Sequence, residues 1–285
     1  MSTTLSATNN PRLPVFRSKS PATCGRSKSP RQLPSADYSL PRVERTPVAS
    51  EWFVPKLRRN VQLAVARPED HDVLLEFLLN EFGTQETLNL ALGLTRSDLL
   101  AVMHETLLAA LSLGLSIVAV DQGRLIGVIV NNWHAVEHEN KRMPRMKEDY
   151  GEDLNAPSEF PLKSRKIHVI LSELKAFLPS FLPAHADRAF YVDIVSVAPQ
   201  YAGCGIGKRL FRESFRLAKA AGFRFCFAIC TATASTRIAE SLGMENRFVF
   251  VYREFVCDGE RVFPATMRDD CEGASLMVGD LQAID

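Results

Sequence analysis

Apolar and polar positions follow two different periods between Asn60 and Phe263. Short apolar runs predict strands at residues 61–66, 115–120, 124–133, 190–197, 224–230, 247–255 and near 261–263. Apolar residues spaced three and four apart predict helices at 69–82, between Thr95 and Gly114, and at 164–182, 206–221 and 234–242. Strands that alternate with helices predict an α/β fold, and the hairpin turn at 121–123 makes the sheet mixed.

Residues 1–58 have a different composition, rich in Ser, Pro and Arg, which predicts a disordered tail. The pentapeptide RSKSP occurs there twice, and Ser20 and Ser29 each precede a proline. A kinase or an adaptor acting on this tail is therefore one expected partner, and a transit peptide is the alternative. We expect a catalytic domain over 59–265 and a C-terminal extension over 266–285.

The overall composition is that of a soluble globular protein, with 285 residues, 46% of them hydrophobic, and a net charge of +1. This balance gives no indication of a nucleic acid or membrane partner. No stretch approaches the roughly 18 apolar residues of a membrane span. The six cysteines show no paired spacing, which favours free thiols and a cytoplasmic location.

The stretch VSVAPQYAGCGIGKRLF places three glycines close together at the start of a predicted helix. A nucleotide P-loop requires Ser or Thr after its Gly-Lys, and a dinucleotide fingerprint requires a third glycine in a different place. Consecutive backbone N–H groups at a helix N-terminus instead suit a pyrophosphate. The cradle would run from Gly203 to Lys208, and a tight turn without a ligand is the alternative.

The segment VAPQYAGCGIGKRL resembles motif A of the GNAT superfamily of N-acetyltransferases. The resemblance implies a twisted, mostly antiparallel mixed sheet of about seven strands, splayed between strands 4 and 5, with helices on both faces. It implies acetyl-CoA as co-substrate and no metal. The implied contacts are pantetheine with Val195, Ser196 and Val197, and pyrophosphate with Gly203, Cys204, Gly205, Ile206, Gly207 and Lys208. Gly205 and Gly207 are expected to be the least replaceable and Gly203 to be more tolerant, and Ala202 departs from the superfamily pattern.

Two further segments, EFGTQETLNLALGL and CTATASTRIAESLGM, resemble the invertebrate arylalkylamine N-acetyltransferases. Gln85 and Thr87 depart from the Asp and Pro that are usual in that group. An alkylamine has a pKa near 10.4 and must lose a proton before it attacks a thioester, so a general base is required. The resemblance makes Glu86 that base.

Asp193 is the second candidate for the base, because strand alternation places it on one face with Val195 and Val197. The resemblance places Thr231, Thr233 and Ser235 where a proton donor to the departing thiolate is expected. Ser235 aligns best, and its alternative role is to cap a helix. We therefore expect direct acetyl transfer from acetyl-CoA to a small arylalkylamine. The alternatives are a polyamine, amino acid or protein amine as acceptor, or a non-catalytic acyl-CoA-binding module.

Overall fold

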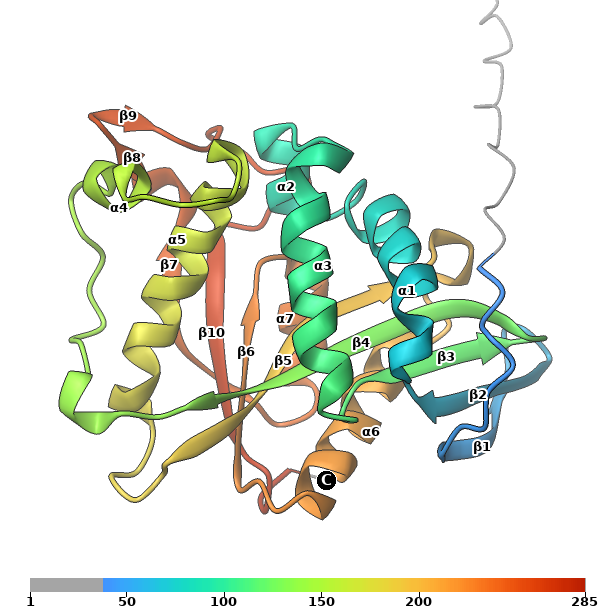
Figure 1. The fold of residues 1–285 in the computed structure, drawn as a ribbon. Coiled ribbons are helices and arrows are strands. Elements are labelled where there is room, and N and C mark those ends of the chain that lie inside the picture. Colours follow the sequence, from blue (N-terminus) through green and yellow to red (C-terminus); the bar gives the residue numbers. More distant parts are fainter. Residues whose placement is uncertain (1–37, 285) are drawn as a thin grey trace, which may run out of the picture. The chain divides into compact units, whose positions relative to one another are not determined.

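The computed structural model describes residues 38–284, so the predictions for Ser20 and Ser29 lie outside the described residues. One sheet organises the described chain (Figure 1). All neighbouring strands run antiparallel except β5 and β6, which are parallel. The sheet order is β1 (Pro47–Val54), β2 (Arg59–Val65), β3 (Ile117–Asp121), β4 (Arg124–Ala135), β5 (Arg188–Val197), β6 (Phe225–Cys230), β10 (Gly273–Asp280) and β7 (Glu245–Val251), with a separate hairpin of β8 (Val256–Cys257) and β9 (Glu260–Arg261).

Helices cover both faces of this sheet, as Figure 1 shows. One face carries α1 (His71–Phe77), α2 (Thr87–Leu92), α3 (Arg96–Ser112), α4 (Gly151–Asn155) and α5 (Leu162–Phe177), and the other carries α6 (Ile206–Ala220) and α7 (Thr233–Glu240). Short helical turns are Pro68–Asp70, Leu78–Phe82, His138–Asn140, Leu178–Phe181, Pro199–Tyr201 and Tyr252–Glu254, the second of them a π-helix that continues α1. None of the described helices is long and apolar enough to cross a bilayer.

Two predicted domain boundaries are wrong. Strand β1 lies inside the expected tail of 1–58 and pairs with β2. Strand β10 lies inside the expected extension of 266–285, yet it sits between β6 and β7 and is almost entirely buried. The run near 261–263, predicted as the last strand of the sheet, contributes only β9 of the small hairpin. A local sequence pattern cannot predict that a C-terminal strand inserts between two earlier strands, because strand order depends on contacts between distant segments.

The sheet opens between β5 and β6, which are strands 4 and 5 of the prediction. They pair only from Phe190 to Val192. Beyond that point β5 continues to Val197 with hydrogen bonds to β4 alone. The edge of β5 that faces β6 is therefore free, and the predicted splay is confirmed.

A bulge at Asp193 changes the predicted facing of β5. Val130 pairs with Ile194 and Asn131 with Val192, so one extra residue lies on β5. Such an insertion reverses the alternation of side chains beyond it. Val195 and Val197 pack with the core on the α6 face, whereas Asp193 interacts with Lys175 of α5 on the other face, so their predicted common face is wrong.

Candidate active site

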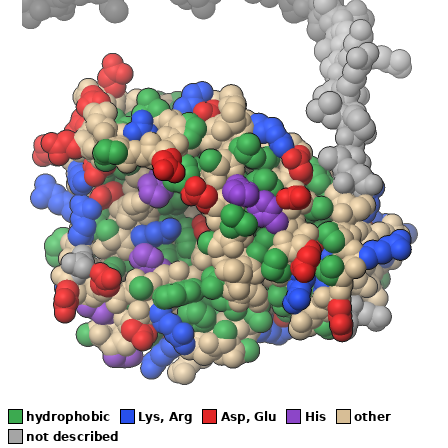
Figure 2. All heavy atoms as spheres, in the orientation of Figure 1, with side chains coloured by type: hydrophobic (Ala, Val, Ile, Leu, Met, Phe, Trp, Pro, Cys, Tyr) green, Lys and Arg blue, Asp and Glu red, His purple; other side chains and the backbone are tan. Residues whose placement is uncertain are grey.

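A cavity of about 370 Å³ extends from the opening between β5 and β6 to the helix layer that contains α2, α3 and α5. Its floor is the free end of β5 with the end of β6, and its walls come from α2, α3 and α5. Figure 2 shows hydrophobic side chains around a hollow on this face, with acidic and histidine side chains nearby. Glu86, Asp193, Thr231 and Ser235 all line this one cavity, together with Val195, Ser196, Val197 and Gly207.

Glu86 is held at the cavity by both of its carboxylate oxygens. It is the N-cap of α2, and its Oε2 accepts a hydrogen bond from the backbone N–H of Asn89 at 2.7 Å. The hydroxyl of Thr231 donates to Oε1 at 2.8 Å. Burial raises the pKa of Glu86, the bonds from Asn89 and Thr231 partly offset that shift, and the nearby negative charge of Asp269 adds to it. A carboxylate with a raised pKa and one donor on each oxygen has the properties of a positioned base.

The turn that carries Thr231 is fixed from two sides. The phenol of Tyr252 donates to the carbonyl of Thr231 at 2.9 Å. Asp269 accepts from the backbone N–H of Thr233 at 2.9 Å, and the Thr233 hydroxyl donates to the Asp269 carbonyl at 3.0 Å. The segment after β7 therefore keeps the Thr231 hydroxyl directed at Glu86.

Asp193 occupies the floor of the cavity on the α5 side. Its carboxylate interacts with the side chains of Tyr191 and Asn132. Burial raises the pKa of Asp193, and the positive charge of Lys175 partly offsets the shift. The Lys175 ammonium lies 4.6 Å from the centroid of the Tyr191 ring. Asp193 thus lies in the field of a nearby cation, whereas Glu86 does not.

The hydroxyls that were predicted as proton donors are engaged with the protein. Thr231 donates to Glu86, and Ser235 donates to the carbonyl of Ala232 at 2.9 Å. Beside Ser235, burial raises the pKa of the Cys230 thiol to about 12, so it stays protonated and is a poor nucleophile near neutral pH.

The glycine loop leads directly into α6. Gly205 is the N-cap of α6, with φ 78°. Because it is a glycine, it has no side chain that could cap the helix. The first N–H groups of a helix lack intrahelical partners, which leaves those of Ile206, Gly207 and Lys208 for a ligand. Gly207 also lines the cavity. The free edge of β5 and this N-terminus fit an extended ligand that ends in phosphates.

The expected ranking of the glycines needs a correction. Gly203 has φ 69°, which favours glycine as strongly as the 78° of Gly205, so Gly203 is not the tolerant position. Gly207 adopts a helical conformation, and a Cβ there would meet only Ile238 Cδ1 at 3.4 Å and Val197 Cγ2 at 3.9 Å. The importance of Gly207 would therefore come from a ligand rather than from the backbone.

The apolar wall of the cavity is drawn from segments that are distant in sequence. Among the aromatic residues of the helices, Phe82 lines the cavity, while Phe77 and Phe177 are buried core. Phe160 also lines it, although it lies outside every predicted helix and strand. Only the packing of α5 against α3 brings such residues together, so no local signal could identify them.

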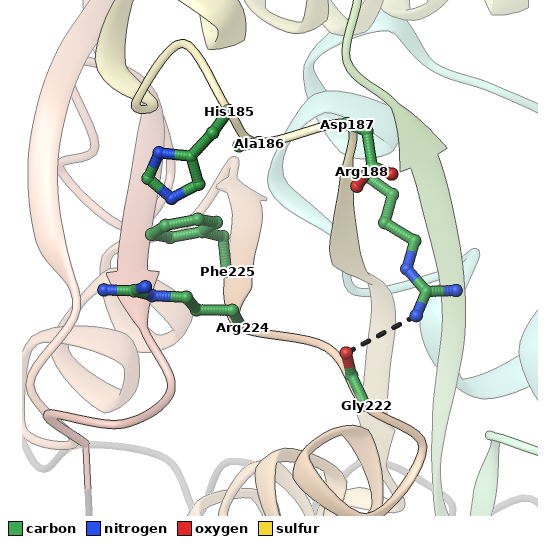
Figure 3. A pocket seen from close by; sticks show the side chains of 7 residues that line it. All are labelled: His185, Ala186, Asp187, Arg188, Gly222, Arg224 and Phe225. Atoms are coloured by element: carbon green, nitrogen blue, oxygen red, sulfur yellow. Dashed lines mark hydrogen bonds between the residues drawn. The ribbon is translucent and has the colours of Figure 1, made fainter.

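A second hollow, of about 290 Å³, lies where β5 and β6 begin (Figure 3). Arg188 donates to the Gly222 carbonyl at 3.4 Å, and the centroids of His185 and Phe225 lie 6.0 Å apart. Seven residues along β5, roughly 23 Å, separate Arg188 from Val195. None of the predicted site residues lines this hollow.

The spacing of His134 and His138 could hold a metal only in a helical segment. His134 instead lies in β4 against the ring of Phe227. His138 Nε2 donates a hydrogen bond to the Ala186 carbonyl at 3.0 Å. Within residues 38–284 there is no group of three or more metal-ligating side chains.

No family model matches the chain. Arylalkylamine N-acetyltransferase 2 from Aedes aegypti is 25% identical, with a TM-score of 0.65 over 78% of this chain and 100% of that one. This chain has the GNAT fold. The predicted resemblance to arylalkylamine N-acetyltransferases is thereby confirmed, and this GNAT protein is an acetyltransferase.

Two other GNAT structures show the same fold. A mosquito arylalkylamine N-acetyltransferase-like 5b protein is 22% identical, with a TM-score of 0.64 over 77% of this chain and 99% of its own. The Drosophila melanogaster polyamine N-acetyltransferase, which forms N-acetylagmatine, is 21% identical, with a TM-score of 0.61 over the same shares. Enzymes with different acceptors thus share this fold.

Proposed function

We propose that this GNAT protein transfers the acetyl group of acetyl-CoA to the primary amine of a small arylalkylamine, with Glu86 as general base. The observation that carries the proposal is the single cavity that joins the free edge of β5 to Glu86. Val195, Ser196 and Val197 would hold the pantetheine arm, and the loop from Gly203 to Lys208 the pyrophosphate. Acetyl-CoA supplies an activated acetyl thioester.

The lining of the cavity supports an amine that carries an apolar body. The described lining residues include the carboxylates of Glu81, Glu86 and Asp193, and no Lys or Arg. An acceptor that arrives as an ammonium ion is attracted by such a lining. The apolar wall excludes water and favours an aryl group over a second charge. Glu86 then takes the proton that the amine must lose, while Thr231 and Asn89 keep its oxygens in place.

A polyamine is the second candidate acceptor, and Asp193 with Glu81 favours it. Two carboxylates besides the base could hold a second cationic group of the acceptor. The negative charge of Asp193, however, is already partly offset by the nearby positive charge of Lys175. An apolar cavity in which one of the two additional carboxylates is already offset by a lysine favours the arylalkylamine over the polyamine.

Purified protein should release free thiol from acetyl-CoA when it is given tyramine, dopamine or serotonin, and less with agmatine or spermidine. Glu86→Gln should lower kcat/KM about 100-fold or more, which is the range for the loss of a catalytic base. Glu81→Gln is the matched control, since it removes another carboxylate of the cavity and should change mainly KM. Normal turnover by Glu86→Gln would remove Glu86 from this role. CoA binding without thiol release on any amine would favour a non-catalytic module.

A further inference from the structure

We propose that Lys56, in the turn between β1 and β2, contributes an additional cation to the phosphates of CoA. The inference rests on the proposed function, because it assumes that the glycine loop holds the pyrophosphate. Lys56 lies far from that loop in sequence. The two meet in space: a Cβ placed on Gly203 would lie 3.0 Å from the Lys56 ammonium nitrogen.

Backbone hydrogen bonds and the packing of one side chain hold the turn between β1 and β2 in place. The backbone N–H of Leu57 donates to the Val54 carbonyl at 3.0 Å, and that of Arg58 donates to the Pro55 carbonyl at 3.2 Å. The side chain of Leu57 packs against the core on the α6 face. Lys56 itself is exposed, so its ammonium can reach a ligand at the surface of the loop.

Two contacts tie the strands on either side of the turn to the glycine loop and α6. On the β1 side, the Arg209 guanidinium of α6 lies 5.6 Å from the centroid of the Trp52 ring. On the β2 side, Arg59 Nε donates to the buried carboxylate of Asp121 at 3.1 Å. Tyr201, just before the loop, donates to the same carboxylate oxygen at 3.0 Å. The turn and the loop are therefore held against each other by a shared network.

Lys56 has no ion-pair partner among the described side chains. The neighbouring Arg59, in contrast, is paired with Asp121. An ammonium that stands unpaired beside the N-terminus of α6 adds to the same positive field. A phosphate is the ligand group that this arrangement suits.

Calorimetric titration of the full chain with CoA tests this role without any reaction. Lys56→Gln should raise the Kd for CoA roughly fivefold at low salt, as expected for one charge contact near the surface, and the difference should shrink as salt screens it. Arg58→Gln is the matched control, since it removes a charge from the same turn and should stay within about twofold of wild type. Equal thermal unfolding of the variants would show that the fold is intact.

A parallel titration with 3′-dephospho-CoA distinguishes the phosphates. An equal loss of affinity for both ligands would assign Lys56 to the pyrophosphate, and a loss for CoA alone would assign it to the 3′-phosphate. An unchanged Kd for both ligands, or an equal effect of Arg58→Gln, would overturn the role of Lys56 while leaving the proposed function intact. A wild-type chain that binds no CoA would overturn both.

Discussion

At the scale of single residues, the structure separates two carboxylates that the sequence could only rank. Glu86 is an N-cap whose oxygens accept from Asn89 and Thr231, and it is not paired with a cation in any described ion pair. Asp193 sits on a bulge and interacts with Lys175, Tyr191 and Asn132. A base must be free to accept a proton from a substrate, so these surroundings favour Glu86.

Replacing Thr231 by Val should shift the pH dependence of the reaction. The Thr231 hydroxyl lowers the pKa of Glu86 against the larger effect of burial. Without it the pKa of Glu86 rises further, and the protonated, inactive form persists to higher pH. The acidic limb of the profile of kcat/KM against pH should therefore move to higher pH. Thr231→Ser keeps the hydroxyl and is the control, and an unshifted limb in Thr231→Val would argue against Glu86 as the titrating base.

At the scale of elements, the C-terminal strand matters more than its sequence position suggests. β10 pairs with β6 over Ser275–Asp280 and with β7 over Gly273–Val278. Leu276 and Met277 are fully buried on opposite faces, each in a different core cluster. The segment before the strand also carries Asp269, which fixes the turn of Thr231.

A chain that ends at residue 265 should therefore fail to fold. Loss of β10 would expose the edges of β6 and β7 and would remove apolar side chains from both cores. Each large apolar side chain that is lost costs about 1.5–3 kcal/mol of stability. A folded domain typically has only about 5–15 kcal/mol of stability in total. We expect no cooperative thermal unfolding by circular dichroism. The control is Leu276→Met in the full chain, which should still unfold cooperatively, and a stable truncated chain would contradict the importance of β10.

At the scale of the whole molecule, the two faces of the sheet contribute different parts of the proposed binding site. The α6 face supplies the glycine loop, and the α3 and α5 layer supplies the apolar wall. The opening between β5 and β6 is the passage that joins them. A ligand that spans both faces should stabilise the fold as a unit.

Thermal unfolding should therefore shift upward with CoA and not with unrelated nucleotides. A ligand at 100 times its Kd adds about 2.7 kcal/mol of stability, which is several degrees for a domain of this size. ATP with magnesium and NAD, at equal concentrations, are the controls, because the loop lacks both of their motifs. An equal shift with ATP would indicate binding of phosphates in general rather than recognition of CoA.

The amino-acid sequence by itself was sufficient for the features that depend on neighbours along the chain. Periodicity predicted α3, α5 and α6 closely, and the glycine spacing predicted a helix N-terminus with free N–H groups. Glu86 was identified by its local motif, and it does lie in the cavity. These properties are encoded locally because turns, caps and helix faces are determined by residues a few positions apart.

Only the tertiary structure decided what depends on contacts between distant segments. It inserted β10 into the sheet, reversed the facing of β5 beyond Asp193, and brought Phe160 to the cavity. It also placed Lys56 beside Gly203. The reason is physical: strand order, register and the approach of one loop to another are set by the burial of whole faces, which no window of the sequence contains.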